Sequence, residues 1–445
     1  MIVDQWESVA DAEWRAAYCR KPVDVYRHLM PDAAAVPARP VVFTEQGRQE
    51  LTRVALDIRE AVRTFVMDRW TTAGQLAAAL GTDVGDLPLT DPDEPITAAA
   101  FEVLRPDVIL ERGTARLLEL NVDGSVGGTR QVDQLGAEFS AAAARSGVVL
   151  REDPGNVPAR FALIGDGLKA SGAAGRHIVF PHFPEGIVPH MRPWEGFASW
   201  TEAMSPQAEE LGLSCAPFPL SGLTLGDTGR LLAGGREVDA VVRLFTTADQ
   251  PAGPGLEALK TAVLGRRVLL HTSEIGELVS NKRLLAWMWD AVRKDDPSWG
   301  EVVRRHVPES VDLDPAAGDA AALLARACGE QDSWVLKPAG GYGGQGVVVG
   351  ADTDPGTWRR ALDACLVPDG GQSAVLQRRV TDDGLTMTFT DGSSRPVTLR
   401  VPVVYGPFVF GQNAGGVLVR HGSEPGPGVV NIQRGACWNT VLTVG

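Results

Sequence analysis

A single lysine stands at the start of a glycine-rich loop, between two apolar segments, in the sequence WVLKPAGGYGGQGVVVG (residues 334–350). Glycine has no Cβ, so the backbone N–H groups of such a loop can close around a phosphate chain, with Lys337 as a positive charge at its root. Gly341, Gly343 and Gly346 match GxGxxG, but β-branched residues rather than a helix follow, which excludes a dinucleotide-binding turn. The lysine precedes the glycines, which excludes a Walker A loop. The pattern predicts a β-hairpin lid over a phosphate; a surface hairpin with a solvated lysine is the alternative.

A second segment, RPDVILERGTARLLELNVDGSVGG (residues 105–128), carries acidic, amide and basic side chains on two extended stretches. The stretches flank ERGT, which predicts a β-hairpin with Gly113 in its turn. A three-residue turn, 112–114, would place Glu111 opposite Ala115, and counting back from that pair fixes the register. Side chains alternate between the two faces of a strand, so four polar residues would share one face. They are Arg105, Asp107, Glu119 and Asn121, and the other face would hold Val108, Leu110, Leu118 and Leu120.

In this register Asp107 lies directly opposite Glu119, and Arg105 lies opposite Asn121. Opposed residues have Cβ atoms about 4.5–5.5 Å apart, so the two carboxylates would repel each other unless a cation lay between them. Mg2+ prefers a few carboxylate or amide oxygens together with phosphate oxygens, and an arginine beside it suits a phosphoryl group. The hairpin therefore predicts a magnesium site. The alternative is a solvated outer face, which is common in antiparallel sheets.

The composition of the chain limits its partners. It has 445 residues, of which 44% are hydrophobic, and by its length we expect roughly two to four domains. No stretch approaches the roughly 18 consecutive apolar residues of a membrane span, and MIVDQWESVADAEW lacks a signal-peptide core, so we expect a cytoplasmic protein with no membrane partner. A net charge of −14 argues against a nucleic-acid partner. Five cysteines without CxxC spacing indicate neither a disulfide framework nor a zinc site.

The elements around the two segments alternate between helix and strand. Residues 47–70 place apolar side chains at helical spacing, which predicts an amphipathic helix packed on a core. Residues 177–180 and 238–245 predict buried strands, and residues 194–213 predict a helix between them. Arg243, on the second strand, is a candidate for contact with substrate or phosphate. The alternation predicts an α/β fold.

Taken in order, these segments resemble a known family. RPD, ELN, SNKRLLAWMWD (residues 280–290), the glycine-rich hairpin, VLQRRV (375–380) and GGVLVR (415–420) follow one another as in the glutathionylspermidine synthetase-like branch of the ATP-grasp superfamily. The ordered set is specific, although each piece alone is not. The resemblance implies an α+β fold, with a circularly permuted ATP-grasp core and a Rossmann-like pre-ATP-grasp substrate domain.

The resemblance implies a division of the chain into four regions. Residues 1–155 would hold an N-terminal helical region and the metal-binding strands, and residues 156–279 the α/β substrate domain. Residues 280–375 would form the nucleotide-binding lid subdomain, and residues 376–445 would return to the ATP-grasp core.

The resemblance also implies roles for single residues in phosphoryl transfer. Asp107, Glu119 and Asn121 would ligate Mg2+. Arg105 and Arg420 would stabilise the phosphoryl group while it is transferred.

Other residues would bind ATP in the same resemblance. Lys282 and Lys337 would hold the phosphates from two sides, with Lys282 in the first turn of a helix that Ser280 caps. Gln377 would line the adenine pocket, beside an apolar flank at residues 375–376. The lid would consist of Gly340, Gly341, Gly343, Gly344 and Gly346.

These roles imply an ATP-dependent carboxylate-amine ligase. Members of the superfamily make an acyl phosphate from a carboxylate and the γ-phosphate of ATP, and an amine then displaces phosphate to form an amide. Such chemistry needs positioning and charge neutralisation rather than a protein nucleophile, and Asp123 is a candidate for a general base. Two alternatives stay open, namely phosphoryl transfer to a small molecule without an amine, and a nucleotide-binding module without turnover. The expected partners are ATP, Mg2+, a small carboxylate and a small amine, and a homodimer is left open.

Overall fold

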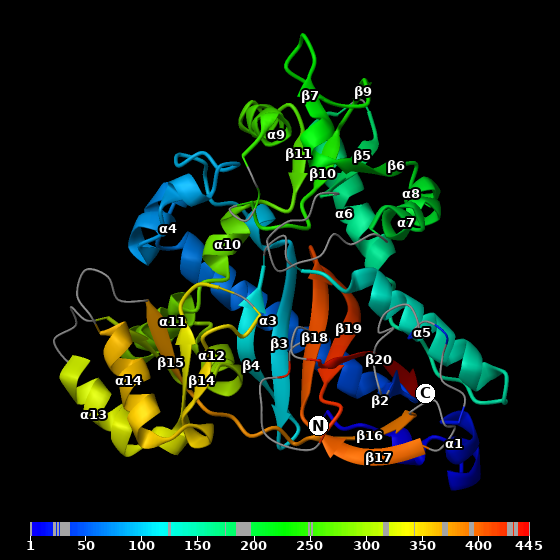
Figure 1. Ribbon diagram of the computed structural model, residues 1–445, viewed down its shortest axis with the longest axis vertical. Coiled ribbons are helices and arrows are strands. Elements are labelled where there is room, and N and C mark those ends of the chain that lie inside the picture. The colour runs from blue at the N-terminus through cyan, green and yellow to red at the C-terminus, as the bar shows by residue number, and fades with distance from the viewer. Residues whose placement is uncertain are drawn as a thin grey trace.

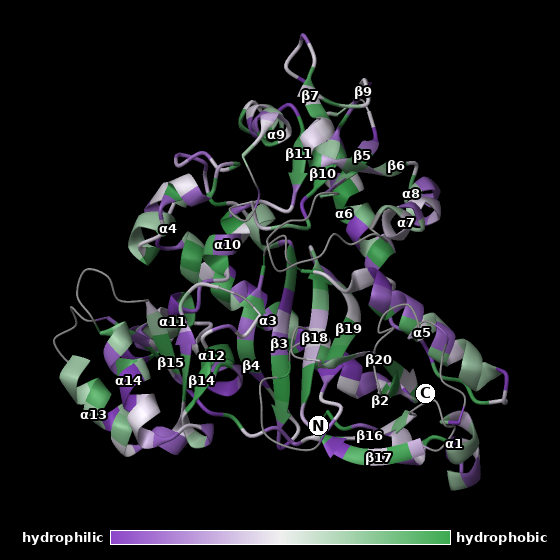
Figure 2. Cartoon of the chain, in the orientation of Figure 1, coloured by the Kyte–Doolittle hydropathy of each residue, from purple (hydrophilic) through white to green (hydrophobic). Residues whose placement is uncertain are grey.

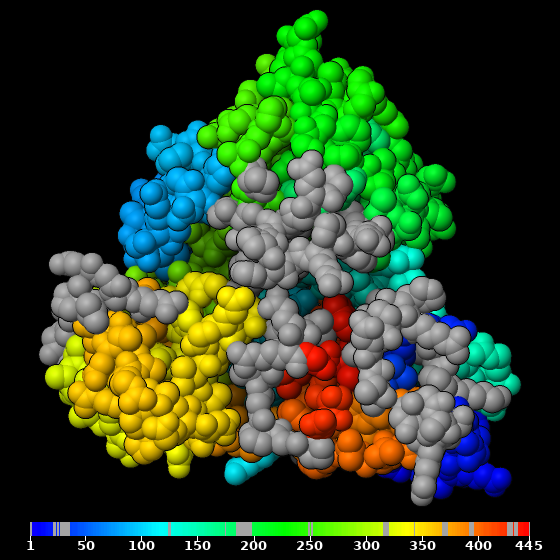
Figure 3. All heavy atoms as spheres, viewed as in Figure 1, coloured from blue at the N-terminus to red at the C-terminus, as the bar shows by residue number. Residues whose placement is uncertain are grey.

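The computed structural model describes residues 2–20, 24, 26, 36–122, 126–173, 175–183, 197–247, 250, 252–314, 320–341, 343–366, 373–390, 396–424, 430 and 435–444. Figure 1 shows a central sheet, a second sheet with its helices on the left, and a third sheet at the top. The same view in space-filling form shows the top lobe, in green, above the other two (Figure 3). No helix within these ranges is both long and apolar enough to span a bilayer.

The central sheet has six strands, which are antiparallel except for the pair β2 and β20. It brings together segments from both ends of the chain. Its spatial order is β2 (Val41–Thr44), β20 (Cys437–Val444), β19 (Asn413–His421), β18 (Val403–Phe410), β3 (Val103–Glu111) and β4 (Thr114–Asn121).

Helix α3 (Glu45–Met67) covers one face of the central sheet. Thr44 caps it by accepting a hydrogen bond from the N–H of Gly47. The apolar stripe predicted for residues 47–70 is buried against the sheet, which confirms the helix. Full burial of such side chains stabilises the fold by about 1.5–3 kcal/mol each. The stripe consists of Leu51, Val54, Ile58, Ala61, Val62, Phe65 and Val66.

Helices α5 (Thr129–Ala144) and α6 (Asn156–Ala170) pack on part of the opposite face of the central sheet. Val132 of α5 joins a cluster with Phe408 and Leu418 on this side of the sheet. Asp107 lies on this same face of the sheet, in the part that forms the candidate site.

The second sheet is antiparallel and has the order β12 (Ser310–Leu313), β15 (Ala374–Arg378), β13 (Trp334–Pro338) and β14 (Val348–Val349). Helices α13 (Ala320–Gly329) and α14 (Pro355–Cys365) share its core through Trp334 and Trp358. Helix α11 (Arg283–Asp295) contacts β12 and β15. Strands β13 and β14 pair on either side of the glycine-rich loop, which confirms the predicted hairpin.

The third sheet is parallel, with the order β11 (Leu269–His271), β10 (Ala240–Val242), β5 (His177–His182) and β6 (Ser214–Pro219). Its inner strands are hydrophobic, and the outer helix α8 (Ser205–Glu210) is largely polar (Figure 2). The helix predicted for residues 194–213 is instead two helices, α7 (Phe197–Glu202) and α8 (Ser205–Glu210). Pro206 in the first turn of α8 explains the break, because proline favours a helix start and disrupts a helix interior. The strand predicted for residues 238–245 covers only Ala240–Val242.

Smaller elements complete the fold. One short sheet consists of β1 (Val36–Pro37), β16 (Leu385–Thr390) and β17 (Pro396–Val401), and another of β7 (Leu223–Leu225), β8 (Leu231–Ala233) and β9 (Arg236–Glu237). The remaining helices are α1 (Ala12–Tyr18), α4 (Ala73–Leu80), α9 (Pro254–Leu264), α10 (Ile275–Val279) and α12 (Gly300–His306). All five cysteines are free thiols.

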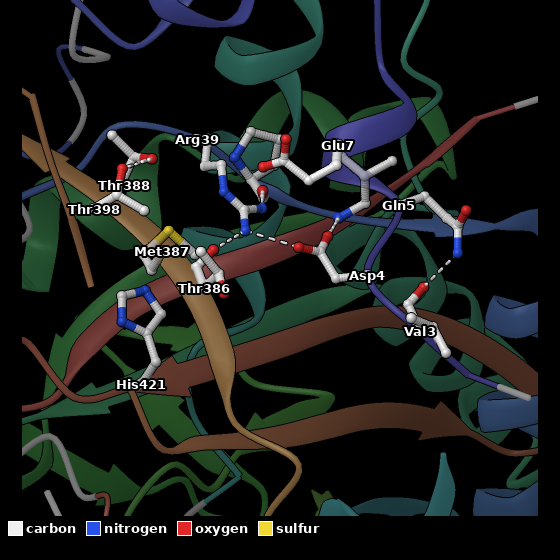
Figure 4. A network of polar contacts seen from close by, with 12 residues as sticks. Val3, Asp4, Gln5, Glu7, Arg39, Thr386, Met387, Thr388, Thr398 and His421 are labelled. Atoms are coloured by element: carbon white, nitrogen blue, oxygen red, sulfur yellow. Dashed lines mark hydrogen bonds and ion pairs between the residues drawn. The ribbon is translucent and has the colours of Figure 1, made fainter. Parts of the chain in front are cut away.

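Arg39 joins the N-terminal segment to strand β16 (Figure 4). Its buried guanidinium donates to Oδ2 of Asp4 at 2.7 Å and to the carbonyl of Thr386. The second oxygen of Asp4 accepts from the N–H of Val42 on β2 at 2.9 Å. The network fixes the small sheet against the edge of the central one.

Candidate active site

The β3–β4 hairpin sets the positions of the acidic residues. Asp107 pairs with Glu119 and Arg105 with Asn121, as the sequence predicts. The predicted three-residue turn is wrong, because Glu111 pairs with Thr114 and the turn consists of Arg112 and Gly113 alone, both with positive φ. A β-bulge between the turn and Asp107 shifts the register by one residue and restores the predicted pairs.

Leu118 is the extra residue of this bulge. The sequence predicts Leu118 on the buried apolar face, but there the structure has Leu117, which belongs to the main hydrophobic core, whereas Leu118 lines a cavity on the other side. Leu118 lies on β4, the outermost strand of the central sheet, and its carbonyl oxygen has a partner outside that sheet. That oxygen accepts a hydrogen bond from Nζ of Lys337 at 2.8 Å.

Asp107 is the centre of a buried polar cluster. It is 1% exposed, which excludes the solvated outer face considered from the sequence. Its oxygens accept from Nε of Arg105 at 3.1 Å, Nη2 of Arg420 at 2.5 Å and Nδ2 of Asn121 at 3.0 Å. Burial would raise the pKa of Asp107, but the adjacent Arg420 and Arg105 outweigh it and lower this pKa below its usual value. Asp107 is therefore a carboxylate at neutral pH.

Arg105 makes its contacts within the protein. Besides Asp107 it donates to the carbonyl of Gly127 at 2.9 Å, and its guanidinium lies 5.8 Å from the ring centroid of Phe408. Burial lowers the pKa of Arg105. These contacts hold Asp107 and the segment that leads into α5.

Lys337 lies at the root of the glycine loop, between the central and second sheets. It is 8% exposed, and its Nζ donates to Oε1 of Gln377 at 2.7 Å and to the carbonyl of Leu118. Burial lowers the pKa of Lys337 to about 8, although Glu119 acts in the opposite direction. The solvated lysine considered from the sequence is excluded.

Lys282 lies on the other side of Glu119. Its Nζ is 3.1 Å from the carbonyl oxygen of Gly341, to which it donates, and 3.7 Å from Oε2 of Glu119. The predicted cap by Ser280 is wrong: Ser280 ends α10, and its Oγ accepts from the N–H of Val122 and donates to Gly276. Lys282 itself is the N-cap residue of α11. Oδ1 of Asn281 accepts a hydrogen bond from the N–H of Arg283 in the first turn of this helix.

The glycine loop needs glycine at several positions. Gly341, Gly343, Gly344 and Gly346 have positive φ, a region that residues with a Cβ rarely adopt. At Gly346 a Cβ would also lie 2.8 Å from Cγ of Pro338. Gly340 has no such requirement, since nothing lies within 4 Å of its Cβ position.

Two cavities meet at Glu119, which lines both. The first has a volume of about 420 Å3 and also contains Asp107, Lys337, Gly344, Gln377 and Arg420. The second has a volume of about 250 Å3 and also contains Asn121, Lys282, Gly340 and Gly341. The residues predicted from the sequence thus converge on one region but divide between two hollows. Arg105, Gly343 and Gly346 support this region without lining either cavity.

The apolar wall of the first cavity differs from the predicted one. Val375 and Leu376 are buried within the second sheet, so they do not form the expected flank. Ile109, Val335 and Val349 form an apolar wall instead.

Sequence reasoning missed the loop at residues 380–384, which also lines the first cavity. Asp382 holds this loop, since its carboxylate accepts from the N–H groups of Gly384 at 2.9 Å and Val403 at 2.7 Å. The Asp-x-Gly spacing is typical of such a turn and could have indicated it. The side chain of Arg400 closes the same side of the cavity and donates to the carbonyl of Asp383.

Two other predicted candidates have different outcomes. Arg243 is fully buried and lines neither cavity; it lies 2.5 Å from Glu277 and donates to the carbonyls of Thr272 and Ser273, so it supports the loop before α10. The prediction of substrate contact by Arg243 is therefore wrong. Asp123 lies outside the described residues.

Within the described ranges no group of three or more histidine, cysteine, aspartate or glutamate side chains is arranged to hold a metal ion. On the hairpin Asp107 lies directly opposite Glu119, and Nδ2 of Asn121 donates to Asp107 at 3.0 Å.

No protein-family model matches this sequence, and no curated protein matches it. Among solved structures, a glutathione synthetase-like effector from Globodera pallida in its apo form is similar, with a TM-score of 0.57 at 12% sequence identity over 92% of this chain and 90% of that chain. A putative γ-glutamylcysteine synthetase from Methylobacillus flagellatus KT has a TM-score of 0.41 at 10% identity over 76% of this chain and 80% of that chain, which is too low to support an argument. The chain thus shares a mixed α/β fold with the effector.

Proposed function

We propose that this protein is an ATP-dependent carboxylate-amine ligase, which forms an amide or peptide bond through an acyl phosphate and releases ADP and phosphate. The observation that carries the proposal is the convergence of Asp107, Glu119, Lys282 and Lys337 at the junction of two sheets. These residues come from distant parts of the chain, and all lie within the walls of two adjoining cavities. The fold shared with a glutathione synthetase-like protein supports the same class of enzyme.

The first cavity suits a nucleotide. Lys337 and Arg420 provide positive charge at its base, where Asp107 fixes the arginine, and an apolar wall of Ile109, Val335 and Val349 suits the face of a purine. Its volume of about 420 Å3 is within the usual range for small-molecule sites. In the proposed complex Lys282 reaches the phosphates from the other side of Glu119.

Mg2+ fits the donor set of the hairpin. Glu119 and Asn121 each offer an oxygen, and the three contacts to Asp107 leave about one of its four lone-pair positions free. Mg2+ commonly takes one or two carboxylates and completes its shell with water and substrate phosphate oxygens. When bound, the ion would neutralise phosphate charge beside these three residues.

The proposed reaction has two steps. A carboxylate oxygen attacks the γ-phosphorus, the bond to the bridging β–γ oxygen breaks, and ADP leaves. The amine nitrogen then attacks the acyl carbon, the carbon–oxygen bond to phosphate breaks, and a proton leaves the nitrogen. Lys337, Lys282 and Arg420 would stabilise the charge on the phosphoryl oxygens, which is the main demand of this chemistry.

Phosphate release across a panel of carboxylates, each with and without amines, tests the proposal. A ligase releases phosphate and ADP only when both substrates are present. Release with one substrate alone would favour phosphoryl transfer, and ATP binding without any release would favour a binding module. Glu119→Gln is the matched control with strongly reduced activity, because it removes one charge and little volume.

A further inference from the structure

A chain of buried hydrogen bonds leads away from Lys337 across three strands of the second sheet. Nζ of Lys337 donates to Oε1 of Gln377, and Nε2 of Gln377 donates to Oγ of Ser310 at 3.3 Å. The hydroxyl of Ser310 in turn donates to the carbonyl of Pro308 at 3.0 Å. Gln377 pairs directly with Ser310 and is a diagonal neighbour of Lys337, two residues along β15 from Val375, which Lys337 faces. Ser310 is fully buried and lines neither cavity.

The far end of this series of hydrogen bonds determines which group donates and which accepts at each step. The carbonyl of Pro308 can only accept, and it also accepts from Nε1 of Trp289 at 2.9 Å. A serine hydroxyl has one proton, so once Ser310 donates it to Pro308 the hydroxyl can only accept from Gln377. The NH2 group of Gln377 must therefore face Ser310, and its carbonyl oxygen must face Lys337. Two acceptors, Gln377 and the carbonyl of Leu118, then surround the lysine nitrogen.

We propose that Ser310 is a positioning residue for Lys337. Through Gln377 it keeps an acceptor against the lysine nitrogen, and so holds this group charged and directed at the phosphates. The inference rests on the proposed role of Lys337 in nucleotide binding. Without the hydroxyl the amide of Gln377 is free to rotate and to present its N–H groups to the lysine, which disfavours the ammonium form.

Other charged groups around Lys337 stay in place when Ser310 is changed. They are Glu119 on β4, Asp107 on β3 and Lys282 before α11, and each already influences Lys337. Because none contacts Ser310, a change of titration in a Ser310 variant reports on the hydrogen-bonded chain.

The experiment measures the titration of Lys337 itself. The full-length protein is labelled with isotope-coded acetic anhydride between pH 6 and 10, and the acetylation of Lys337 is followed by mass spectrometry. The wild type should titrate near pH 8, Ser310→Ala should titrate at lower pH, and Ser310→Thr, which retains the hydroxyl, should restore the wild-type midpoint. Ser140→Ala is the control, since it removes a partly buried hydrogen bond from the hydroxyl of Ser140 on α5 to the carbonyl of Leu150, away from the site.

A wild-type titration of Lys337 in Ser310→Ala would overturn the proposal. If that variant does not fold, Ser310→Cys gives the same test, because a thiol is a weak hydrogen-bond acceptor and should also lower the midpoint of Lys337; an unchanged midpoint would again overturn the proposal. Affinity for ATP with Mg2+ should be roughly 3- to 10-fold weaker in Ser310→Ala at pH 7.5, as expected for one hydrogen bond, and should recover at lower pH. Protection of wild-type Lys337 by ATP tests the proposed function separately: its absence would contradict nucleotide binding and leave the titration result intact.

Discussion

Nη2 of Arg420 lies 2.5 Å from Oδ2 of Asp107, and Nε of Arg105 lies 3.1 Å from the other oxygen of the same carboxylate. One buried negative charge thus faces two buried positive charges. The arrangement keeps Asp107 ionised and fixes Arg420 at the wall of the first cavity.

Asp107→Asn should lower the free energy of unfolding by about 3–5 kcal/mol at pH 7, because two buried guanidinium groups lose their counter-charge. The pKa of Asp107 is lowered on folding, so its contribution to stability is present above the unfolded pKa of about 4 and is lost as the pH falls through the lower folded value. Denaturant unfolding at pH 7 and pH 3 measures this, and the difference between the variant and the wild type should be smaller at pH 3 than at pH 7. An equal difference at both pH values would contradict the charge argument.

Glu119→Gln should reduce turnover by on the order of 10²-fold while leaving stability nearly unchanged. Glu119 is partly exposed at the junction of the cavities, and its contact with Lys282 is long at 3.7 Å. Phosphate release and thermal unfolding of the same preparation separate the two effects. Wild-type turnover would remove Glu119 from the proposed chemistry.

Lys337→Ala should lose turnover to a similar extent, on the order of 10²-fold, but should also be less stable by about 1–3 kcal/mol. The substitution leaves the carbonyl of Leu118 and Oε1 of Gln377 without their donor. Denaturant unfolding of Lys337→Ala beside Glu119→Gln should show the difference. Equal stability of the two variants would mean that the bridge between the sheets contributes little.

The pH dependence of nucleotide binding should reflect Lys337. Its pKa is lowered to about 8, so in the free protein the ammonium charge is present below that pH and is lost above it. The folded state binds fewer protons than the unfolded chain between about pH 8 and 10.4, and stability should therefore rise over this window. Calorimetric titration with ATP and Mg2+ should show affinity falling above pH 8. Lys337→Met should lack both the loss of affinity and the rise in stability.

Two glycine substitutions in the loop should have opposite outcomes. Gly346→Ala should destabilise the loop by at least about 1 kcal/mol, because the new Cβ meets a positive φ and lies 2.8 Å from Pro338. Gly340→Ala, six residues earlier in the same loop, meets open space and should behave like wild type. Phosphate release by both variants is the measurement, and equal activity would show that the loop tolerates the strain.

The sequence was informative about the hairpin because hydrophobic alternation limits register. Asp107 and Glu119 are paired as predicted, yet the prediction combined two compensating errors, a turn one residue too long and a missing bulge. A bulge leaves alternation intact on both sides and so has little sequence signature. The carbonyl of Leu118, which binds Lys337, could not have been found from residue types at all.

The other predictions failed where a residue's partner lies far away in the sequence. Two residues just before α11, Ser280 and Asn281, could cap this helix. The N–H of Val122, far away in the sequence, donates to Ser280, and Asn281 accepts from the first turn of α11. Arg243 looked like a ligand-binding residue because a charged residue in an apolar strand is unusual, but its partner Glu277 lies on a helix that the strand pattern does not locate. Position along one element was predictable; partners on other elements were not.

Glu119 forms the partition between the two cavities, so both compartments draw on the same carboxylate. A ligand on one side that attracts Glu119 withdraws it from a ligand on the other. Thermodynamic linkage requires that any such influence be mutual and equal in size for the two affinities. Through this one side chain, a ligand in either cavity would change the affinity of the other cavity for its own ligand.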